Sequence, residues 1–226
     1  MGVRIQPYEN ERHDVAKALT SGQERALLAV TANTDSACHT ATIIALNTAM
    51  RKDEIRWLRW GQIDFEKRTL TVGRSKTDAG TGRLIPLNAV AFEALALWAA
   101  RFPGSGAEHY VFPSCGSRQI DPARPTKGWR TAWRNALKRA GFHCRFHDLR
   151  VTCITKLAES QASDMTIMSI AGHVSRQMLE HYSRIRTDIK RAALEAIAEP
   201  IFQAGVHQNV HQPLSGNGSD KAKLLN

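Results

Sequence analysis

The stretch GHVSRQMLEHYSR, residues 172–184, lies near the C-terminal end of the part of the chain that is patterned like a folded domain. It opens with a Gly-His pair, and an amphipathic segment follows. Tyr182 comes nine positions after His173, among arginines. A tyrosine in a helical segment is by default a packing residue, because its hydroxyl, with a reference pKa of about 10, is a poor nucleophile unaided. A reactive Tyr182 therefore requires an anion site supplied by other parts of the chain.

The chain as a whole is basic. It has 226 residues, with 31 Lys and Arg against 21 Asp and Glu, and a formal net charge of +10. This balance favours a polyanionic partner, nucleic acid first and an anionic membrane surface second. No apolar run of about 18 residues is present, so we expect no membrane span. The opening MGVRIQPYEN lacks the apolar region of a signal peptide, which predicts a cytoplasmic protein.

Cysteine usage predicts neither a disulfide framework nor a metal site. The cysteines are scattered without CxxC spacing: Cys38, Cys115, Cys144 and Cys153. His143, Cys144 and His147 form one local cluster of possible ligands. No second ligand pair at a finger-like spacing accompanies them, so we expect no zinc.

The apolar pattern predicts an α+β fold, mostly helical with one small antiparallel sheet. A capping box at residues 21–24 begins a first helix, and a second covers 37–50 and continues to about Trp60. RTLTV (68–72) and RLIPL (83–87) predict short strands joined by a polar, Gly-rich turn. Further helices are expected over 88–101, 126–140, 147–159, 164–171, 175–182 and 187–198. We expect an entry segment at 1–18, a domain over 19–200 and a flexible tail at 201–226.

Basic residues that could contact a phosphodiester occur at four places. Arg51 and Glu54 lie three residues apart, where an acceptor can hold a guanidinium, although a surface ion pair is the simpler interpretation. Lys76 lies on the turn between the two strands, where a lysine is usually only solvated. A flexible ammonium on a turn that reaches substrate can protonate a leaving oxygen.

The other two places are HDLRVT and the opening stretch. His147 and Arg150 are three residues apart, so both project from one side of a helix, and together they suit the binding of phosphate oxygens. A lone HxxR is a weak signal that occurs in many helices. The Gly172–His173 turn and Tyr182 complete the set. Each motif alone favours a structural interpretation.

Together and in this order the motifs closely resemble the tyrosine recombinase, or phage integrase, family. The resemblance rests on Arg51 within TAMRKDE, Lys76, His147-x-x-Arg150, Gly172–His173 and Tyr182. It runs from about Leu19 to Ala198 and includes LRWGQIDFEKRTLTV and RLIPL.

The resemblance implies a catalytic-domain fold that cuts and rejoins DNA through a covalent 3′-phosphotyrosine link. Tyr182 is then the nucleophile, and Arg51 and Arg150 hold the non-bridging oxygens. Lys76 is the general acid for the 5′-oxygen, while His147 and His173 assist proton movement and phosphate contact. The supporting and DNA-contacting residues expected beside them are Glu54, which orients Arg51, and Lys67, Arg74 and Arg83. No metal, ATP or other cofactor is implied.

Several departures and partner expectations accompany the resemblance. Ala49 stands where the family usually has Gly, and Ala171 where a Leu commonly precedes Gly-His. Family members usually carry a separate DNA-gripping domain before the catalytic one, for which about twenty residues are too few, so we expect a catalytic fragment or a reduced member. The expected partner is double-stranded DNA. We expect the protein to form a homotetramer on DNA and to be weakly associated or monomeric without it. A nucleoid-associated location follows.

Two alternatives remain open at this stage. A type IB topoisomerase resembles the family in its chemistry and in much of its catalytic set. A regulatory DNA-binding protein could keep the fold without catalysis, but it has no physical need to retain Tyr182 together with four basic groups.

Overall fold

The computed structural model describes residues 17–76, 80–116, 119–174, 187, 190–191 and 193–198. The chain divides into two units, Met1–Ile189 and Lys190–Asn226. In the second unit, residues 190–191 and 193–196 are helical. Three predicted features lie wholly or almost wholly outside the described residues. They are the segments 1–18 and 201–226 and the helix 175–182, which contains Tyr182.

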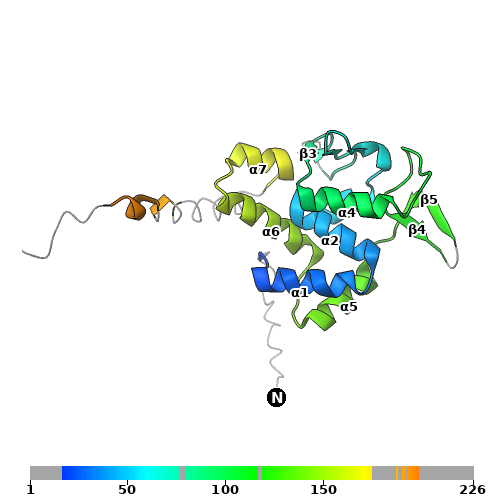
Figure 1. Cartoon of the computed structure of the whole chain (residues 1–226), viewed down its shortest axis with the longest axis horizontal. Coiled ribbons are helices and arrows are strands. Elements are labelled where there is room, and N and C mark those ends of the chain that lie inside the picture. The colour runs from blue at the N-terminus through cyan, green and yellow to red at the C-terminus, as the bar shows by residue number, and fades with distance from the viewer. Residues whose placement is uncertain are drawn as a thin grey trace, which may run out of the picture. The chain divides into compact units, whose positions relative to one another are not determined.

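Helices form the bulk of the first unit (Figure 1), and the predicted fold class is confirmed. Helix α2 (Ser36–Thr48) lies against α1 (Ser21–Ala32), α3 (Lys52–Arg56), α4 (Ala89–Ala99) and α6 (Phe146–Glu159). Helix α5 (Arg130–Ala140) packs on α1, and α7 (Asp164–Ala171) packs on α6 and on strand β3.

Helix α2 is buried along most of its length, and its threonines show how a polar sequence can occupy that place. Thr42 and Thr48 are fully buried. Their hydroxyls donate to the carbonyls of Cys38 and Ile44, four residues earlier in the helix. These bonds satisfy the hydroxyls without another partner, so the helix can be enclosed at little polar cost.

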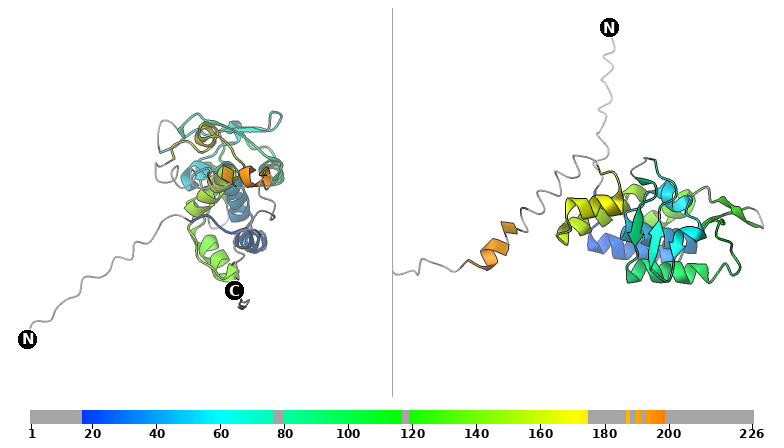
Figure 2. Two further views of the ribbon diagram at one scale, coloured as in Figure 1. Left: turned by 90° about the vertical axis from the view of Figure 1, so that its left-hand side faces the viewer. Right: turned by 90° about the horizontal axis from the view of Figure 1, so that it is seen from above.

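A three-stranded antiparallel sheet covers one side of the unit (Figure 2). Strand β2 (Thr69–Thr71) is central, between β1 (Ile63–Asp64) and β3 (Leu84–Pro86), with Leu70 opposite Ile85. Both of these side chains are buried, on the face of the sheet that is turned toward the core. A second hairpin, β4 (Pro113–Cys115) with β5 (Ile120–Pro125), was not expected from the sequence.

Two expectations about helix boundaries need correction. The capping box of α1 is formed by Thr20 and Gln23, one residue before the predicted position. The predicted continuous helix through residues 51–60 is wrong, because α2 ends at Thr48 and the next residue, Ala49, has the left-handed conformation with φ 53°. The chain turns there, α3 is a separate short helix, and Trp60–Gln62 form a 3₁₀ turn. The left-handed turn at Ala49 places Arg51 at the start of α3.

Candidate phosphodiester-binding site

Five of the predicted residues lie together on the surface of the first unit. Arg51, Lys76 and His147 line a cleft of about 560 Å³ together with Glu54 and Arg74. Arg51 comes from the start of α3, Lys76 from the segment between β2 and β3, and His147 from the first turn of α6. Segments at least about seventy residues apart in sequence, 51–76 and His147, therefore supply one surface.

Arg150 lies beside this cleft and is only 3% exposed. Its Nη1 donates to the carbonyl oxygens of Ala49 and Ala171, the latter at 2.7 Å, and its Nη2 donates to that of His173 at 3.0 Å. Burial and the neighbouring Arg51 lower the pKa of Arg150 to about 10, so it stays charged at neutral pH. Among its described hydrogen-bond acceptors there is no carboxylate. A buried cation held only by carbonyls retains its attraction for an anion.

The Gly172–His173 turn joins Arg51 and Arg150. Arg51 Nη2 donates to the His173 carbonyl at 3.2 Å, so this one oxygen accepts from both guanidinium groups. Gly172 has φ 74° and ψ −146°, a conformation that is essentially restricted to glycine. The sequence expectation concerned the imidazole of His173, which is exposed. The backbone of this turn is what orients the arginines.

Glu54 is hydrogen-bonded to Arg51, three residues earlier in the sequence. Its Oε1 accepts from Arg51 Nη1 at 2.9 Å, and its Oε2 accepts from the Arg51 backbone N–H at 2.8 Å. Burial raises the pKa of Glu54, but hydrogen bonds from Arg83, Ser75 and Arg51 outweigh it and bring the pKa to about 2. The carboxylate is therefore ionised at neutral pH.

The histidine of HxxR is exposed at the edge of the cleft. Partial enclosure by the protein and the charge of Arg150 lower the pKa of His147 from its ordinary value of 6.5. The neutral imidazole, which can accept as well as donate a proton, is therefore the favoured form at neutral pH in the absence of a bound anion.

The three residues expected to contact DNA have different surroundings. Arg74 lines the cleft and lies over the ring of Trp57, 4.8 Å from its centroid. Lys67 pairs with Asp64 at 3.3 Å and lies beside a different surface opening. The Arg83 side chain is only 6% exposed and binds Glu54, so the expected DNA contact of Arg83 is corrected to an internal role. Arg83 directly follows the polar turn, where basic residues are usually exposed. The sequence alone therefore did not reveal that its side chain is buried.

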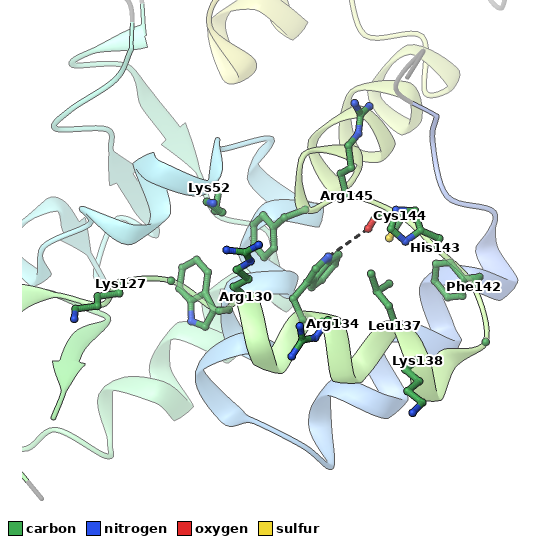
Figure 3. A pocket seen from close by; sticks show the side chains of 15 residues that line it. Lys52, Lys127, Arg130, Arg134, Leu137, Lys138, Phe142, His143, Cys144 and Arg145 are labelled. Atoms are coloured by element: carbon green, nitrogen blue, oxygen red, sulfur yellow. Dashed lines mark hydrogen bonds between the residues drawn. The ribbon is translucent and has the colours of Figure 1, made fainter. Parts of the chain in front are cut away.

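Sequence reasoning missed a basic groove beside the cleft, of about 970 Å³ (Figure 3). Its floor is aromatic, with Trp129 stacked on Phe146 at a centroid distance of 5.6 Å. Its cationic side chains are Lys52, Lys127, Arg130, Arg134, Lys138 and Arg145. Arg130, Arg134 and Lys138 follow one another at four-residue spacing along α5, a signal that was available in the sequence. Lys52 lines both the groove and the cleft, so the two basic surfaces are continuous.

Potential metal ligands do not gather in this part of the structure. Among the described residues, no three His, Cys, Asp or Glu side chains are grouped so that they could hold a metal ion. Across the same ranges, every helix is too short or too polar to cross a membrane.

The fold places the half-buried Arg51 in the cleft and the buried Arg150 beside it. The family model described as "Phage integrase family" matches residues 17–188. The chain belongs to the phage integrase family, whose members are the tyrosine recombinases.

Two curated relatives agree with this assignment. A shufflon-specific DNA recombinase of Escherichia coli is 31% identical over 172 residues, covering 75% of this chain and 40% of the relative. The integrase of Salmonella phage P22 is 27% identical over 150 residues, covering 62% of this chain and 37% of the relative. The chain thus spans about two fifths of the length of these relatives.

Solved structures share the fold at low sequence identity. The Tn1549 transposon integrase, in complex with circular intermediate DNA, is 19% identical with a TM-score of 0.62, over 80% of this chain and 66% of that chain. The catalytic domain of bacteriophage HP1 integrase is 18% identical with a TM-score of 0.53, over 81% of this chain and 99% of that domain.

Proposed function

We propose that this chain is the catalytic domain of a site-specific DNA recombinase that cuts and rejoins DNA through a 3′-phosphotyrosine intermediate. The observation that carries the proposal is the shared carbonyl of His173, which brings together the guanidinium groups of Arg51 and the buried Arg150. Two fixed cations beside one cleft match the paired non-bridging oxygens of a phosphodiester, where charge develops in the transition state.

The proposed reaction exchanges one phosphate ester for another. The Tyr182 oxygen attacks phosphorus and loses its phenolic proton, with assistance from His147 or His173, and the bond from phosphorus to the 5′-oxygen breaks. Lys76 donates a proton to that leaving oxygen. In the return step a 5′-hydroxyl attacks the phosphotyrosine and Tyr182 leaves. The number of ester bonds is unchanged, so the proposed steps need no ATP. The cationic side chains of Arg51, Arg150 and Lys76 supply the charge stabilisation that a metal would otherwise give.

DNA is the proposed partner, and the continuous basic surface supports its binding. The cleft and the groove share Lys52, and α5 adds a row of cations that can follow a phosphate backbone. We further propose assembly as a tetramer on DNA and weak association in free solution. In the second unit, Leu194 and Ile197 are 66% and 76% exposed, which leaves apolar surface for such assembly. A stable tetramer in light scattering without DNA would count against this part of the proposal.

A nicked suicide substrate tests the reaction. The nick lies just beyond the cleaved bond, so that the freed fragment diffuses away and the covalent adduct accumulates. Duplexes with randomised cores are incubated with the chain, and adducts are captured under denaturing conditions and sequenced. We expect an adduct with the unmodified chain and none with Tyr182→Phe, which keeps the ring and DNA binding. An adduct formed by Tyr182→Phe, or no adduct from any duplex, contradicts the proposal.

A further inference from the structure

Arg83 connects three elements that carry proposed catalytic residues. Its Nη2 donates to Glu54 Oε2 at 2.5 Å and its Nη1 to Glu54 Oε1 at 3.2 Å, next to Arg51. Nη1 also donates to the carbonyl of Gly80 at 2.6 Å, at the far end of the segment that carries Lys76. Nε donates to the carbonyl of Ile170 at 2.9 Å, at the end of α7 just before the His173 turn.

The segment that carries Lys76 is held at both of its ends by this pair of charges. Ser75, adjacent to Lys76, donates through its Oγ to Glu54 Oε1 at 2.6 Å. Gly80, on the other side, is bound through its carbonyl to Arg83. Because Glu54 and Arg83 are themselves ion-paired and buried, the two ends of the segment are fixed to one rigid unit.

The packing around Gly80 leaves little freedom for another arrangement. A Cβ atom added to Gly80 would lie 2.2 Å from Ser75 Oγ and 3.2 Å from Arg83 Nη1. A Cβ added to Gly172 would lie 3.4 Å from Gly80 Cα and 3.6 Å from Arg83 Nη1. The two glycines therefore bring the Lys76 segment and the His173 turn together over the Arg83 side chain.

We propose that Arg83 is a positioning residue for Lys76: with Glu54 it fixes residues 75 and 80, and thereby the place at which the lysine ammonium meets the leaving oxygen. This inference rests on the proposed function. Arg83 is too buried to contact DNA itself, so its effect on the reaction passes through the segment that it holds. A guanidinium is required because it donates to one carboxylate and two carbonyls at once, which an ammonium cannot do in a single plane.

The test compares two forms of the captured suicide duplex, with oxygen or sulfur at the bridging 5′ position. A thiolate leaves without a proton, so sulfur removes the need for a general acid. Loss of folded protein slows both substrates equally, whereas a misplaced Lys76 slows only the oxygen substrate. Single-turnover cleavage is measured for Arg83→Met, Arg83→Lys, Ser75→Ala and Lys76→Ala, with DNA affinity and thermal unfolding of each variant.

We expect Arg83→Met to cleave the oxygen substrate about a hundredfold more slowly, the scale of a small misplacement of a reacting group. Ser75→Ala should slow cleavage of the oxygen substrate less than Arg83→Met does, and Arg83→Lys should have a rate between those of Arg83→Met and the unmodified chain. On the sulfur substrate, all of these variants should cleave at about the rate of the unmodified chain. Combining Arg83→Met with Lys76→Ala should slow the oxygen reaction no further than Lys76→Ala alone. The DNA affinity of the Arg83 and Ser75 variants should stay within about twofold, because these changes remove no phosphate-contacting residue.

Leu95→Ala is the matched control for lost stability. Leu95 is fully buried in α4, and it does not line the cleft. This variant should show no difference between oxygen and sulfur. If Arg83→Met does not fold, Ser75→Ala decides the question in the same way.

The inference is overturned by unchanged cleavage of the oxygen substrate by the folded variants, or by equal slowing of both substrates. Lack of sulfur rescue for Lys76→Ala overturns it as well, because the general acid then lies elsewhere. Failure of the unmodified chain to form an adduct with either substrate instead removes the proposed function on which the inference depends.

Discussion

Arg150 donates a hydrogen bond to the carbonyl oxygen of Ala49, a fully buried residue in the left-handed conformation with φ 53°. A second acceptor of the same guanidinium is the carbonyl of Ala171. Ala49 and Ala171 are both among the positions where the sequence analysis expects a departure from the pattern of the family that the chain resembles. Both departures therefore lie directly behind a proposed catalytic arginine and act on it through the backbone.

Substitution of Ala49 should separate backbone strain from side-chain packing. In Ala49→Gly, relief of about 1 kcal/mol of left-handed strain offsets the loss of about 0.8 kcal/mol from one buried carbon, so stability and cleavage should change little. In Ala49→Val, a β-branched side chain meets both the disfavoured φ and a closed core, and we expect a loss of about 3 kcal/mol. Denaturant unfolding and adduct formation measure both effects. A Val variant as stable as the unmodified chain contradicts this account.

Lys76 and Arg51 should respond differently to sulfur at the bridging position. Lys76→Ala should cleave normal DNA about a hundredfold or more slowly, as expected for a lost general acid, and sulfur should restore most of the rate. Arg51→Ala should not be restored, because its charge acts on the non-bridging oxygens. Single-turnover rates on the two substrates decide. Equal rescue of both variants, or of neither, moves the general acid to Arg74, which shares the cleft with Lys76.

The basic groove should contribute to DNA binding mainly through charge. Arg134→Ala should weaken binding to all duplexes and reduce the slope of log affinity against log salt by about 0.9, the value for one lost phosphate contact. Lys67→Ala removes the same charge, but Lys67 lies beside a different surface opening, so the slope should stay unchanged. Salt titrations of fluorescence anisotropy measure both. Equal changes would favour the sequence-based assignment of Lys67 to DNA.

Local patterns predicted most helices because each carries its own signals. Helices α4 and α7 lie within about one to two residues of the predicted ranges, since their caps, Asn88 and Ser163, and their apolar spacing are local. The left-handed turn at Ala49 escaped prediction because the apolar pattern runs through it without a glycine. The β4–β5 hairpin escaped because β5 is largely exposed and polar, without an alternating apolar face.

The sequence indicated several residues that the structure brings to one cleft, but few of the contacts among them. Three-residue spacing is enough to relate Arg51 to Glu54, which the structure joins at 2.9 Å. The place of Arg83 depends on a contact with a residue twenty-nine positions earlier, and no local signal distinguishes it from a solvated arginine on a turn. The role of Tyr182 stays a prediction, because it lies outside the described residues.

The buried carboxylate of Glu54 should make a defined contribution to the pH dependence of stability. Its pKa is lowered from 4.5 to about 2 in the folded chain, so the unfolded chain binds its proton more readily. The stabilisation is therefore complete above about pH 4.5 and is lost as the pH falls toward 2. Glu54→Gln leaves Arg83 buried without a counter-charge, and at pH 7 we expect a loss of about 3 kcal/mol.

The difference in the free energy of unfolding between Glu54→Gln and the unmodified chain reports on this carboxylate alone, because all other acidic groups are common to both. Denaturant unfolding at pH 7, 4 and 3 should show a difference that is largest at pH 7 and narrows steadily below pH 4.5. Asp53→Asn, on the same helix, is the control: Asp53 is exposed and pairs only with Arg56 among its described ion pairs, so the change should be within about 1 kcal/mol. A stability difference for Glu54→Gln that stays constant from pH 7 to 3 would show that the carboxylate is not held ionised by Arg83, Ser75 and Arg51.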